Sequence, residues 1–408
     1  MENKPVTISL EKRINAPAEQ IYASFTNATR LRRWLCHSAT LVAEEEGRLY
    51  LAWDNGYYTA GYYLSLIPNQ KIVFTWRGKN EPDQTLVTIT IFADGEENIV
   101  RLDHSGLKDT PEWETNYTEI KDGWAMSLEN LASVLETGID LRISKRPMLG
   151  IFPAEYEDEN SDQIPVKSAI KINDVVECLA AEKCGLQAGD ILVKFAEFPI
   201  TDWPSLTNAI SQFKAGDEVK IEYYRDGILE HCNVKLSPQL LPTLPESPKA
   251  LAEELKANQT KVLDQMMLHL RNISDEEASF KPEGNEWSIK EIVAHLIHTE
   301  QELQNWINQL IHSQEPIFDD EIGNHHAWVK ATVSLYPSLH QLIEMLRSSL
   351  EVTSAFISFL PEEIKHDKAA FWYLGYHIIQ FPMHMRSHIE QIKKNKDNFF
   401  SLETNIFY

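Results

Sequence analysis

Two histidines four residues apart, His384 and His388, stand near the end of the chain. They fall in a segment, residues 368–394, whose apolar spacing predicts one long helix. Side chains four apart on a helix share a face, with Cβ atoms about 5–6 Å apart, which suits two imidazoles that bind one divalent ion. His295, on another segment with helical periodicity, offers a third imidazole. Three neutral ligands leave coordination positions open, as in catalytic metal sites, so the pattern indicates a three-histidine metal site between two helices.

The alternative is that the pair has no metal role, because the chain holds 14 histidines and this spacing also arises by chance. Other polar residues lie within helical reach of the three predicted ligands. We expect His298 and His377 either to contact the ligand histidines without binding the metal or to pack in the core. We expect Glu302 to accept a hydrogen bond from an imidazole. The adjacent His325 and His326 are expected at the surface.

The composition excludes several classes of protein. A chain of 408 residues predicts two to four domains, and 43% hydrophobic residues suffice for packed cores. The formal net charge of −23 argues against binding to nucleic acid or to an anionic membrane surface, since both require a basic face. There is no run of about 18 apolar residues, so no transmembrane helix is predicted.

Cysteine usage and the first residues bear on the compartment. The four cysteines, Cys36, Cys178, Cys184 and Cys232, are scattered without a C-x-x-C pair, a pattern more typical of free thiols than of a disulfide framework. Charged residues appear from Met1 onward, with no apolar secretory region. Together these features predict a cytoplasmic protein.

The run from Trp287 to Leu296, followed far downstream by His384-x-x-x-His388-x-x-Gln391, resembles the DinB family over residues 248–396. Members of that family are four-helix bundles with a three-histidine metal site at these motif positions. The resemblance therefore implies that His295, His384 and His388 bind a divalent metal ion. Imidazole suits zinc, nickel, copper or iron, and the sequence does not choose among them. Some relatives are transferases or isomerases that bring a low-molecular-weight thiol to the metal, which implies a thiol cofactor.

The first third of the chain predicts a strand, two small helices, several turn-punctuated strands and a long closing helix. Its motifs are residues 14–21, Trp34, Gly61-Tyr62-Tyr63, residues 68–76 and Gly123-Trp124. This set resembles the activator-of-heat-shock-ATPase-like branch of the START-like (SRPBCC) superfamily, which has a helix-grip fold.

START-like domains often enclose an apolar cavity between the sheet and the long helix, which implies an apolar small molecule as ligand. The candidate lining residues are Trp53, Tyr62, Phe74, Trp76 and Trp124. The alternative for each is that it fills the core.

Three stretches of the middle segment, residues 146–151, 180–193 and 214–227, combine strand alternation with glycine turns. A helix is predicted at residues 203–213, with Pro204 in its first turn. Together they resemble a PDZ domain of the bacterial protease-associated kind.

In PDZ domains a Leu-Gly-Ile loop presents backbone N–H groups to the terminal carboxylate of a peptide, which then adds as a strand. The matching residues here are Leu149, Gly150 and Ile151, which implies a C-terminal peptide as partner. The chain departs from the pattern at Pro153, which offers no N–H to a ladder, and in the acidic run of residues 155–162. A domain that acts only as a spacer is the alternative.

The predicted architecture is a multidomain α+β protein. It comprises a START-like helix-grip domain at residues 1–140, a PDZ-like β domain at 141–238, a proline-rich linker at 239–248 and an all-α DinB-like four-helix bundle at 249–408. Within the last helix of the bundle, Pro382 predicts a bend just before the histidine pair.

Two functions fit these patterns best, and a third, a purely structural fusion of domains, explains least of them. The first is a metal- and thiol-dependent transferase, with a ligand pocket in the START-like domain and a peptide-binding or partner-binding PDZ-like domain. The second is a non-enzymatic stress-response or chaperone-adaptor protein whose metal bundle is vestigial. The sequence names no catalytic residue and leaves open whether the protein is an enzyme.

Overall fold

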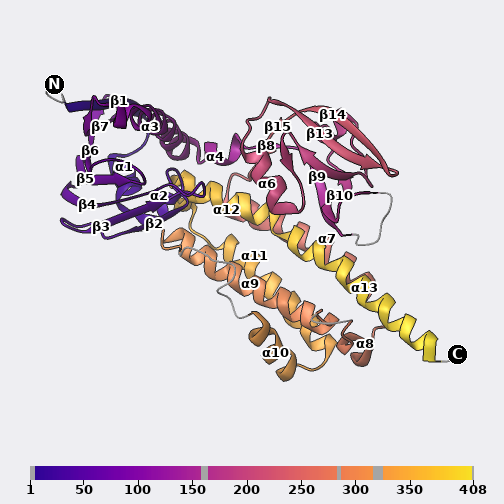
Figure 1. The fold of residues 1–408 in the computed structure, drawn as a ribbon. Helices are drawn as coiled ribbons and strands as arrows, with labels where there is room; N and C mark the ends of the chain where they lie inside the picture. The colour runs from indigo at the N-terminus through magenta and orange to yellow at the C-terminus, as the bar shows by residue number, and fades with distance from the viewer. Residues whose placement is uncertain (1–4, 158–163, 283–285, 316–324, 407–408) are drawn as a thin grey trace. The chain divides into compact units, whose positions relative to one another are not determined.

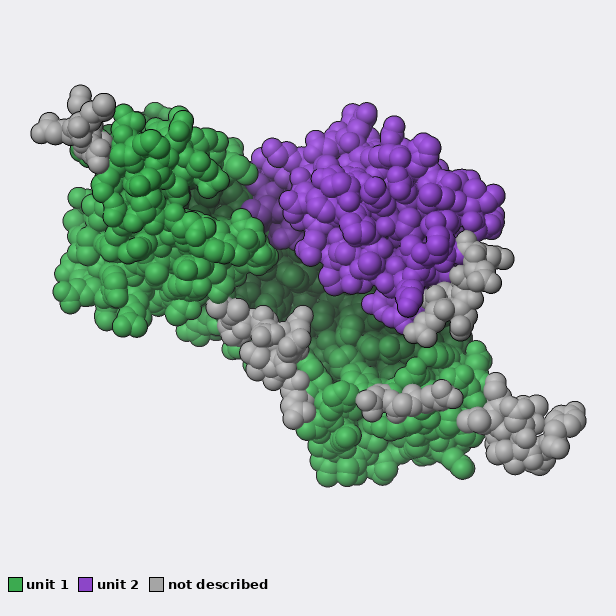
Figure 2. All heavy atoms as spheres, viewed as in Figure 1, with its two compact units in different colours: residues 1–138, 242–408 green, residues 139–241 purple. Residues whose placement is uncertain are grey.

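A computed structural model of the chain describes residues 5–157, 164–282, 286–315 and 325–406, with side chains as far as residue 399. The chain divides into two compact units (Figure 2). Unit 1 joins Met1–Gly138 to Pro242–Tyr408, and unit 2 is Ile139–Leu241. Among the described helices none is both long and apolar enough to cross a membrane.

The N-terminal half of unit 1 is a seven-stranded antiparallel sheet in the order β1-β7-β6-β5-β4-β3-β2, with three helices (Figure 1). The elements are β1 (Pro5–Ile14), α1 (Ala18–Thr26), α2 (Ala28–Arg32), β2 (Ser38–Leu41), β3 (Arg48–Ala52), β4 (Tyr58–Ile67), β5 (Lys71–Gly78), β6 (Thr85–Asp94), β7 (Glu97–Lys108) and α3 (Pro111–Thr137).

The long helix α3 closes the core of this half. Pro111 occupies its first turn, where the missing N–H costs nothing, and Gly138 ends it in the left-handed region at φ +83°. Its face with Trp124, Leu128 and Leu131 is buried in the same apolar cluster as the inner residues of the sheet. The helix-grip arrangement thus follows from one amphipathic helix and the period-two alternation of the strands.

The predicted pocket residues lie in two different environments. Phe74, Trp76 and Trp124 are buried, and Trp76 contacts both other rings and the half-buried Trp53. Tyr62, in contrast, is 47% exposed and does not line the interior. The reason is the alternation of β4, which turns the next residue, the fully buried Tyr63, inward instead.

The C-terminal half of unit 1 is helical. Its elements are α7 (Pro248–Leu270), α8 (Asp275–Ser279), α9 (Ile289–Ile311), α10 (His325–Leu335), α11 (Leu339–Ser358), the 3₁₀ turn η1 (Glu362–His366), α12 (Lys368–Gln380) and α13 (Pro382–Ile406). Helices α7, α9 and α11 pack with the α12–α13 pair as a four-membered bundle (Figure 1). Each long helix buries one apolar stripe in the shared core.

The predicted single helix at residues 368–394 is wrong in one respect, because it is two helices that meet at Phe381. Pro382 lacks an N–H, so the helical ladder stops there and α13 begins with proline in its first turn. Phe381 still donates to the carbonyl of His377, and its own carbonyl accepts from His384 N–H at 3.1 Å. The junction therefore fixes the start of the helix that carries the histidine pair.

The two halves of unit 1 are joined by a buried ionic contact. Arg33 is 4% exposed, and its guanidinium donates to the Leu310 carbonyl and to the Glu315 carboxylate, both at 3.1 Å. Arg30 donates to the carboxylate of Asp367 at 2.8 Å. The C-terminal end of α2 is thereby held against the C-terminal end of α9 and the N-terminal end of α12.

Unit 2 is built on a sheet in the order β14-β13-β11-β10-β9. Its elements are α4 (Leu141–Ser144), β8 (Pro147–Met148), β9 (Ile151–Glu157), β10 (Ser168–Val175), α5 (Ala180–Cys184), β11 (Ile191–Phe195), β12 (Phe198–Pro199), α6 (Trp203–Ser211), β13 (Glu218–Arg225), β14 (Ile228–Lys235) and β15 (Ser237–Pro238). Pro153 is tolerated because β9 ends the strand order, an edge position that proline can occupy. The acidic run continues past Glu157 into residues outside those described.

Candidate metal centre

The structure brings His295, His384 and His388 to one point. The Nε2 atoms of His295 and His384 are 3.3 Å apart, and those of His384 and His388 are 3.1 Å apart. One ligand atom from each of the three residues lies within 4.8 Å of the others. The convergence that the sequence predicts between two distant helices is therefore present in the fold.

Local sequence explains why these side chains meet. Helix α9 starts at a capping box in which the Ser288 hydroxyl accepts from Glu291 N–H and the Glu291 carboxylate accepts from Ser288 N–H. This cap fixes the helix start two turns before His295. Helix α13 starts at Pro382 and presents His384 and His388 on one face, four residues apart.

All three imidazoles favour the neutral form that a metal ligand requires. Burial, with a smaller contribution from the neighbouring imidazoles, lowers the pKa of His295 to about 3 and that of His384 to about 4. Burial also lowers the pKa of His388, against a hydrogen bond to Gln391 that raises it. His388 Nδ1 lies 2.7 Å from Gln391 Oε1, so Nδ1–H donates there and Nε2 keeps its lone pair.

The spacing of the three nitrogens fits a small divalent ion. Ligand nitrogens about 2.0–2.1 Å from a tetrahedral ion are about 3.3–3.4 Å from each other. Two of the three Nε2 separations, 3.1 and 3.3 Å, are close to this value. The Nδ1 atom of His295 is buried without a hydrogen-bond partner among the described residues, and Nε2 is the atom that faces His384. The donor set fits the ion that the sequence predicts.

A second group of ligand atoms lies beside the first. His298, Glu302 and His325 also bring one ligand atom each within 4.8 Å of the others. Glu302 contacts His298 Nε2 at 3.1 Å, so the imidazole that it steadies is that of His298. The expectation that His325 lies at the surface is wrong, because it is half-buried and its ring is 6.2 Å from that of His295. Helix α10 places it there.

His326 is exposed, as expected. His377 lies elsewhere in the bundle, where its ring packs against Trp306 and Tyr373. No contact links it to the three predicted ligands in the part of the chain that the structure describes. Its side chain is exposed, so neither the supporting role nor the core position expected of His377 is found.

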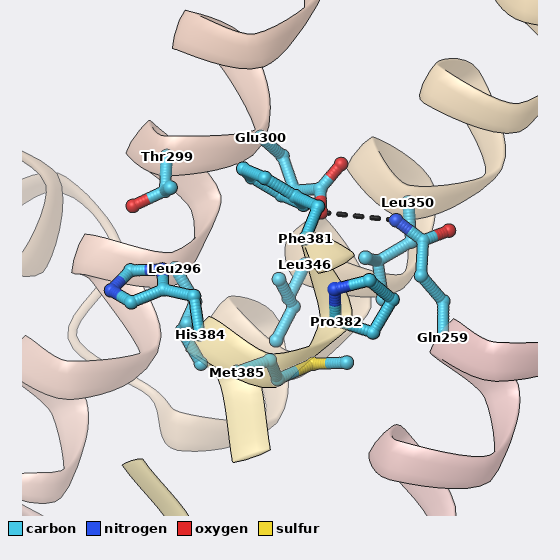
Figure 3. Close-up of a pocket in the computed structure, with 10 residues that line it drawn as sticks. All are labelled: Gln259, Leu296, Thr299, Glu300, Leu346, Leu350, Phe381, Pro382, His384 and Met385. Atoms are coloured by element: carbon cyan, nitrogen blue, oxygen red, sulfur yellow. Dashed lines mark hydrogen bonds between the residues drawn. The ribbon is translucent and has the colours of Figure 1, made fainter. Parts of the chain in front are cut away.

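A buried polar network crosses the bundle next to His384 (Figure 3). The Glu300 carboxylate accepts from the Gln259 amide at 3.1 Å and from the Thr353 hydroxyl at 2.6 Å. Burial raises the pKa of Glu300 to about 7, although both hydrogen bonds lower it. Glu300, Gln259 and His384 line one cavity of about 10 Å³, room for about one water molecule.

Sequence reasoning missed this network, although a signal for it exists. Glu300 lies four residues after Leu296 and three before Leu303, both of which are buried. The position therefore belongs to the apolar stripe of α9, where a carboxylate is out of place unless it is paired. Gln259 in α7 and Thr353 in α11 occupy apolar-stripe positions in the same way.

The predicted peptide-binding residues form the loop before β9. Gly150 has φ +82°, and a Cβ there would lie 2.5 Å from the Leu179 Cβ, so only glycine fits. The Leu149 carbonyl accepts from Ala181 N–H at 2.7 Å, which anchors the loop on α5. Ile151 begins the edge strand.

Comparison with known proteins identifies three domain families along the chain. A model described as "Activator of Hsp90 ATPase homolog 1-like protein" matches residues 15–136, one described as "PDZ domain" matches 147–236, and one described as "DinB superfamily" matches 259–392. The chain thus contains Aha1-like, PDZ and DinB-like domains. The three predicted resemblances and the predicted multidomain fold are confirmed.

Curated relatives match only parts of the chain. "Serine protease Do-like HtrA" of Lactococcus lactis subsp. cremoris (strain MG1363) is 35% identical over 115 residues, which are 26% of this chain and 28% of the relative. "Activator of 90 kDa heat shock protein ATPase homolog 2" of Mus musculus is 28% identical over 86 residues, 21% of this chain and 25% of the relative. The chain thus spans less than a third of the length of either relative.

Solved structures cover about a third of the chain. The Aha1 dimer from Colwellia psychrerythraea shares 21% identity at a TM-score of 0.29, covering 32% of this chain and 96% of that one. Protein CV1439 from Chromobacterium violaceum shares 28% identity at a TM-score of 0.28, covering 33% of this chain and 99% of that one.

Proposed function

We propose that the DinB-like bundle binds a divalent metal ion through His295, His384 and His388 and uses it in a thiol-dependent transfer reaction. The observation that supports the proposal is that three neutral imidazoles lie close enough together to bind one ion. The Nε2 separations are 3.3 Å between His295 and His384 and 3.1 Å between His384 and His388. Zinc, nickel, copper and iron all suit this donor set.

A divalent ion held by three neutral ligands would supply an open position at which a thiol or water loses its proton near neutral pH. The chain supplies a group to hold such a proton. The Glu300 carboxyl lines the same cavity as His384, and its pKa of about 7 lets it gain or lose a proton near neutrality. The Gln391 amide keeps the His388 ring in the orientation that leaves Nε2 for the ion.

The other two domains would select what reaches the bundle. A PDZ domain implies peptide binding, and we assign it to the loop of Leu149, Gly150 and Ile151 beside edge strand β9. In the Aha1-like domain, the buried ring cluster around Trp76 and Trp124 would contact an apolar ligand. The cytoplasmic location stays a prediction.

The first test is the metal content of the full chain, purified without a histidine tag and analysed by mass spectrometry of the elements. We expect one equivalent of a divalent transition metal per chain and less than a tenth of that in the double variant His384→Ala, His388→Ala. The matched control is His340→Ala, His366→Ala, which removes two exposed histidines from the same half of unit 1 and should keep the metal.

The second test asks for the reaction itself. The metal-loaded chain is incubated with glutathione or cysteine and the generic electrophile 1-chloro-2,4-dinitrobenzene, and the thioether product is measured. Turnover that disappears in the double variant and falls in Glu300→Gln supports the transferase proposal. Turnover equal to that of the buffer control contradicts it.

One observation favours the second candidate function, a non-enzymatic adaptor. The cavity beside His384 holds about one water molecule, so this cavity by itself does not admit a thiol and an electrophile. A chain that retains metal, binds C-terminal peptides and gives no thiol transfer would support the adaptor.

A further inference from the structure

Two cysteines that are far apart in the sequence meet in unit 2. Cys184 ends α5 and Cys232 lies in β14, 48 residues later. Their Sγ atoms are 3.1 Å apart. A disulfide requires about 2.05 Å, so an approach of about 1 Å closes the bond. Both thiols are free in the structure, and the fold places them side by side although they are far apart in the sequence.

The two thiols differ in the roles they can take. The Cys232 thiol donates to Cys184 Sγ, and this hydrogen bond lowers the pKa of Cys184 to about 7 and raises the pKa of Cys232. A thiol whose pKa lies near ambient pH is the better attacking nucleophile in thiol–disulfide exchange. Both side chains are half-buried, which leaves a route for a small reagent.

We propose that Cys184 and Cys232 form a reversible intramolecular disulfide when the chain meets a low-molecular-weight disulfide. The Cys184 thiolate attacks one sulfur of the reagent, forms a mixed disulfide and releases one thiolate. Cys232, after losing its proton to solvent, attacks Cys184 Sγ and releases the second thiolate. The two cysteines lose two electrons in total, and the reagent gains them and leaves as two thiols.

The Cys184–Cys232 disulfide would constrain helix α5, which holds the predicted peptide-binding loop in place. Helix α5 holds the loop through the hydrogen bond from Ala181 N–H to the Leu149 carbonyl at 2.7 Å. Leu179, which caps α5, packs against Gly150. A covalent link from Cys184 to β14 fixes α5 to the β13–β14 hairpin. The oxidised domain should therefore open less readily than the reduced one.

The experiment treats the full chain with oxidised glutathione, denatures it under acid quench and alkylates the remaining thiols. We expect the number of alkylated thiols to fall from four to two, with a disulfide peptide that joins Cys184 to Cys232 in the digest. Dithiothreitol should restore all four. In native hydrogen exchange, peptides of α5 should be protected at least several-fold more in the oxidised chain.

Single variants separate the proposed order from chance oxidation. Cys232→Ser should retain glutathione on Cys184, because the resolving thiol is missing, and Cys178→Ser should still form the internal disulfide. Four alkylated thiols after treatment, or glutathione that persists on wild-type Cys184 without the joined peptide, would overturn the proposal. These outcomes do not depend on the metal site, since both cysteines belong to unit 2.

Discussion

Replacement of Glu300 by glutamine should make the bundle more stable at neutral and alkaline pH but not at acidic pH. The carboxyl is 4% exposed, and burial raises its pKa from 4.5 to about 7. Between these values the native state keeps a proton that the unfolded state has lost, so stability falls as pH rises from 4.5 to 7 and is constant above. At 1.36 kcal/mol for each pH unit, the loss reaches about 3 kcal/mol.

Glutamine has the same shape and does not titrate, so Glu300→Gln removes this loss. The chain should first be treated with a chelator, because a bound cation next to the cavity would favour the ionised carboxylate. Hydrogen exchange of the slowest amides in α9 and α11 reports the local free energy of opening. At pH 8 these amides should exchange roughly a hundredfold more slowly in the variant than in the wild type, and at pH 5 the difference should shrink to about fourfold.

The matched control is Glu351→Gln, which neutralises an exposed carboxylate on α11. It should exchange at the wild-type rate at both pH values. If Glu300→Gln were less stable than the wild type at pH 8, the carboxylate would be stabilising in its ionised form. The account of a buried group that is protonated near neutrality would then be refuted.

Three further predictions concern other parts of the chain. Arg33→Met should destabilise unit 1 by about 3–5 kcal/mol in urea unfolding, because it leaves Glu315 without its buried partner, whereas the exposed Arg48→Met should change little. Burial lowers the pKa of His104 to about 4. The free energy of unfolding should therefore be unaffected by this residue above pH 6.5 and should decrease by up to about 3 kcal/mol as the pH falls towards 4. His104→Gln should flatten that part of a plot of the urea midpoint against pH. Gly150→Ala should abolish binding of C-terminal peptides in a calorimetric titration, since its Cβ overlaps Leu179, while Gly216→Ala, which also has a positive φ but open space around it, should still bind.

Most helices and strands of the fold could be predicted from the periodicity of apolar residues in the sequence. Such local patterns predicted the helices of the bundle and the face shared by His384 and His388, because each depends on residues within a few positions of each other. The break at Phe381 was only half predicted: proline indicates a bend, but the surrounding packing decides whether the helix bends or restarts.

Local sequence patterns could not predict contacts between segments that are far apart in the chain. Nothing near Arg33 in the sequence indicates that it meets Glu315, and nothing near Cys184 indicates Cys232. The expectation for Tyr62 was wrong for a simpler reason, because successive residues of a strand face opposite sides and Tyr63 is the one that points inward. Glu300 is different, since its place in an apolar stripe was readable and only its partners were not.

The most direct test of the metal centre is X-ray absorption spectroscopy of the zinc-loaded full chain. Three imidazole nitrogens at about 2.0–2.1 Å, with the multiple-scattering pattern of histidine rings, are expected in the wild type, and one fewer in His388→Ala. A first shell made of oxygen without imidazole scattering, or one unchanged by His388→Ala, would show that the ion binds elsewhere and contradict the proposed site.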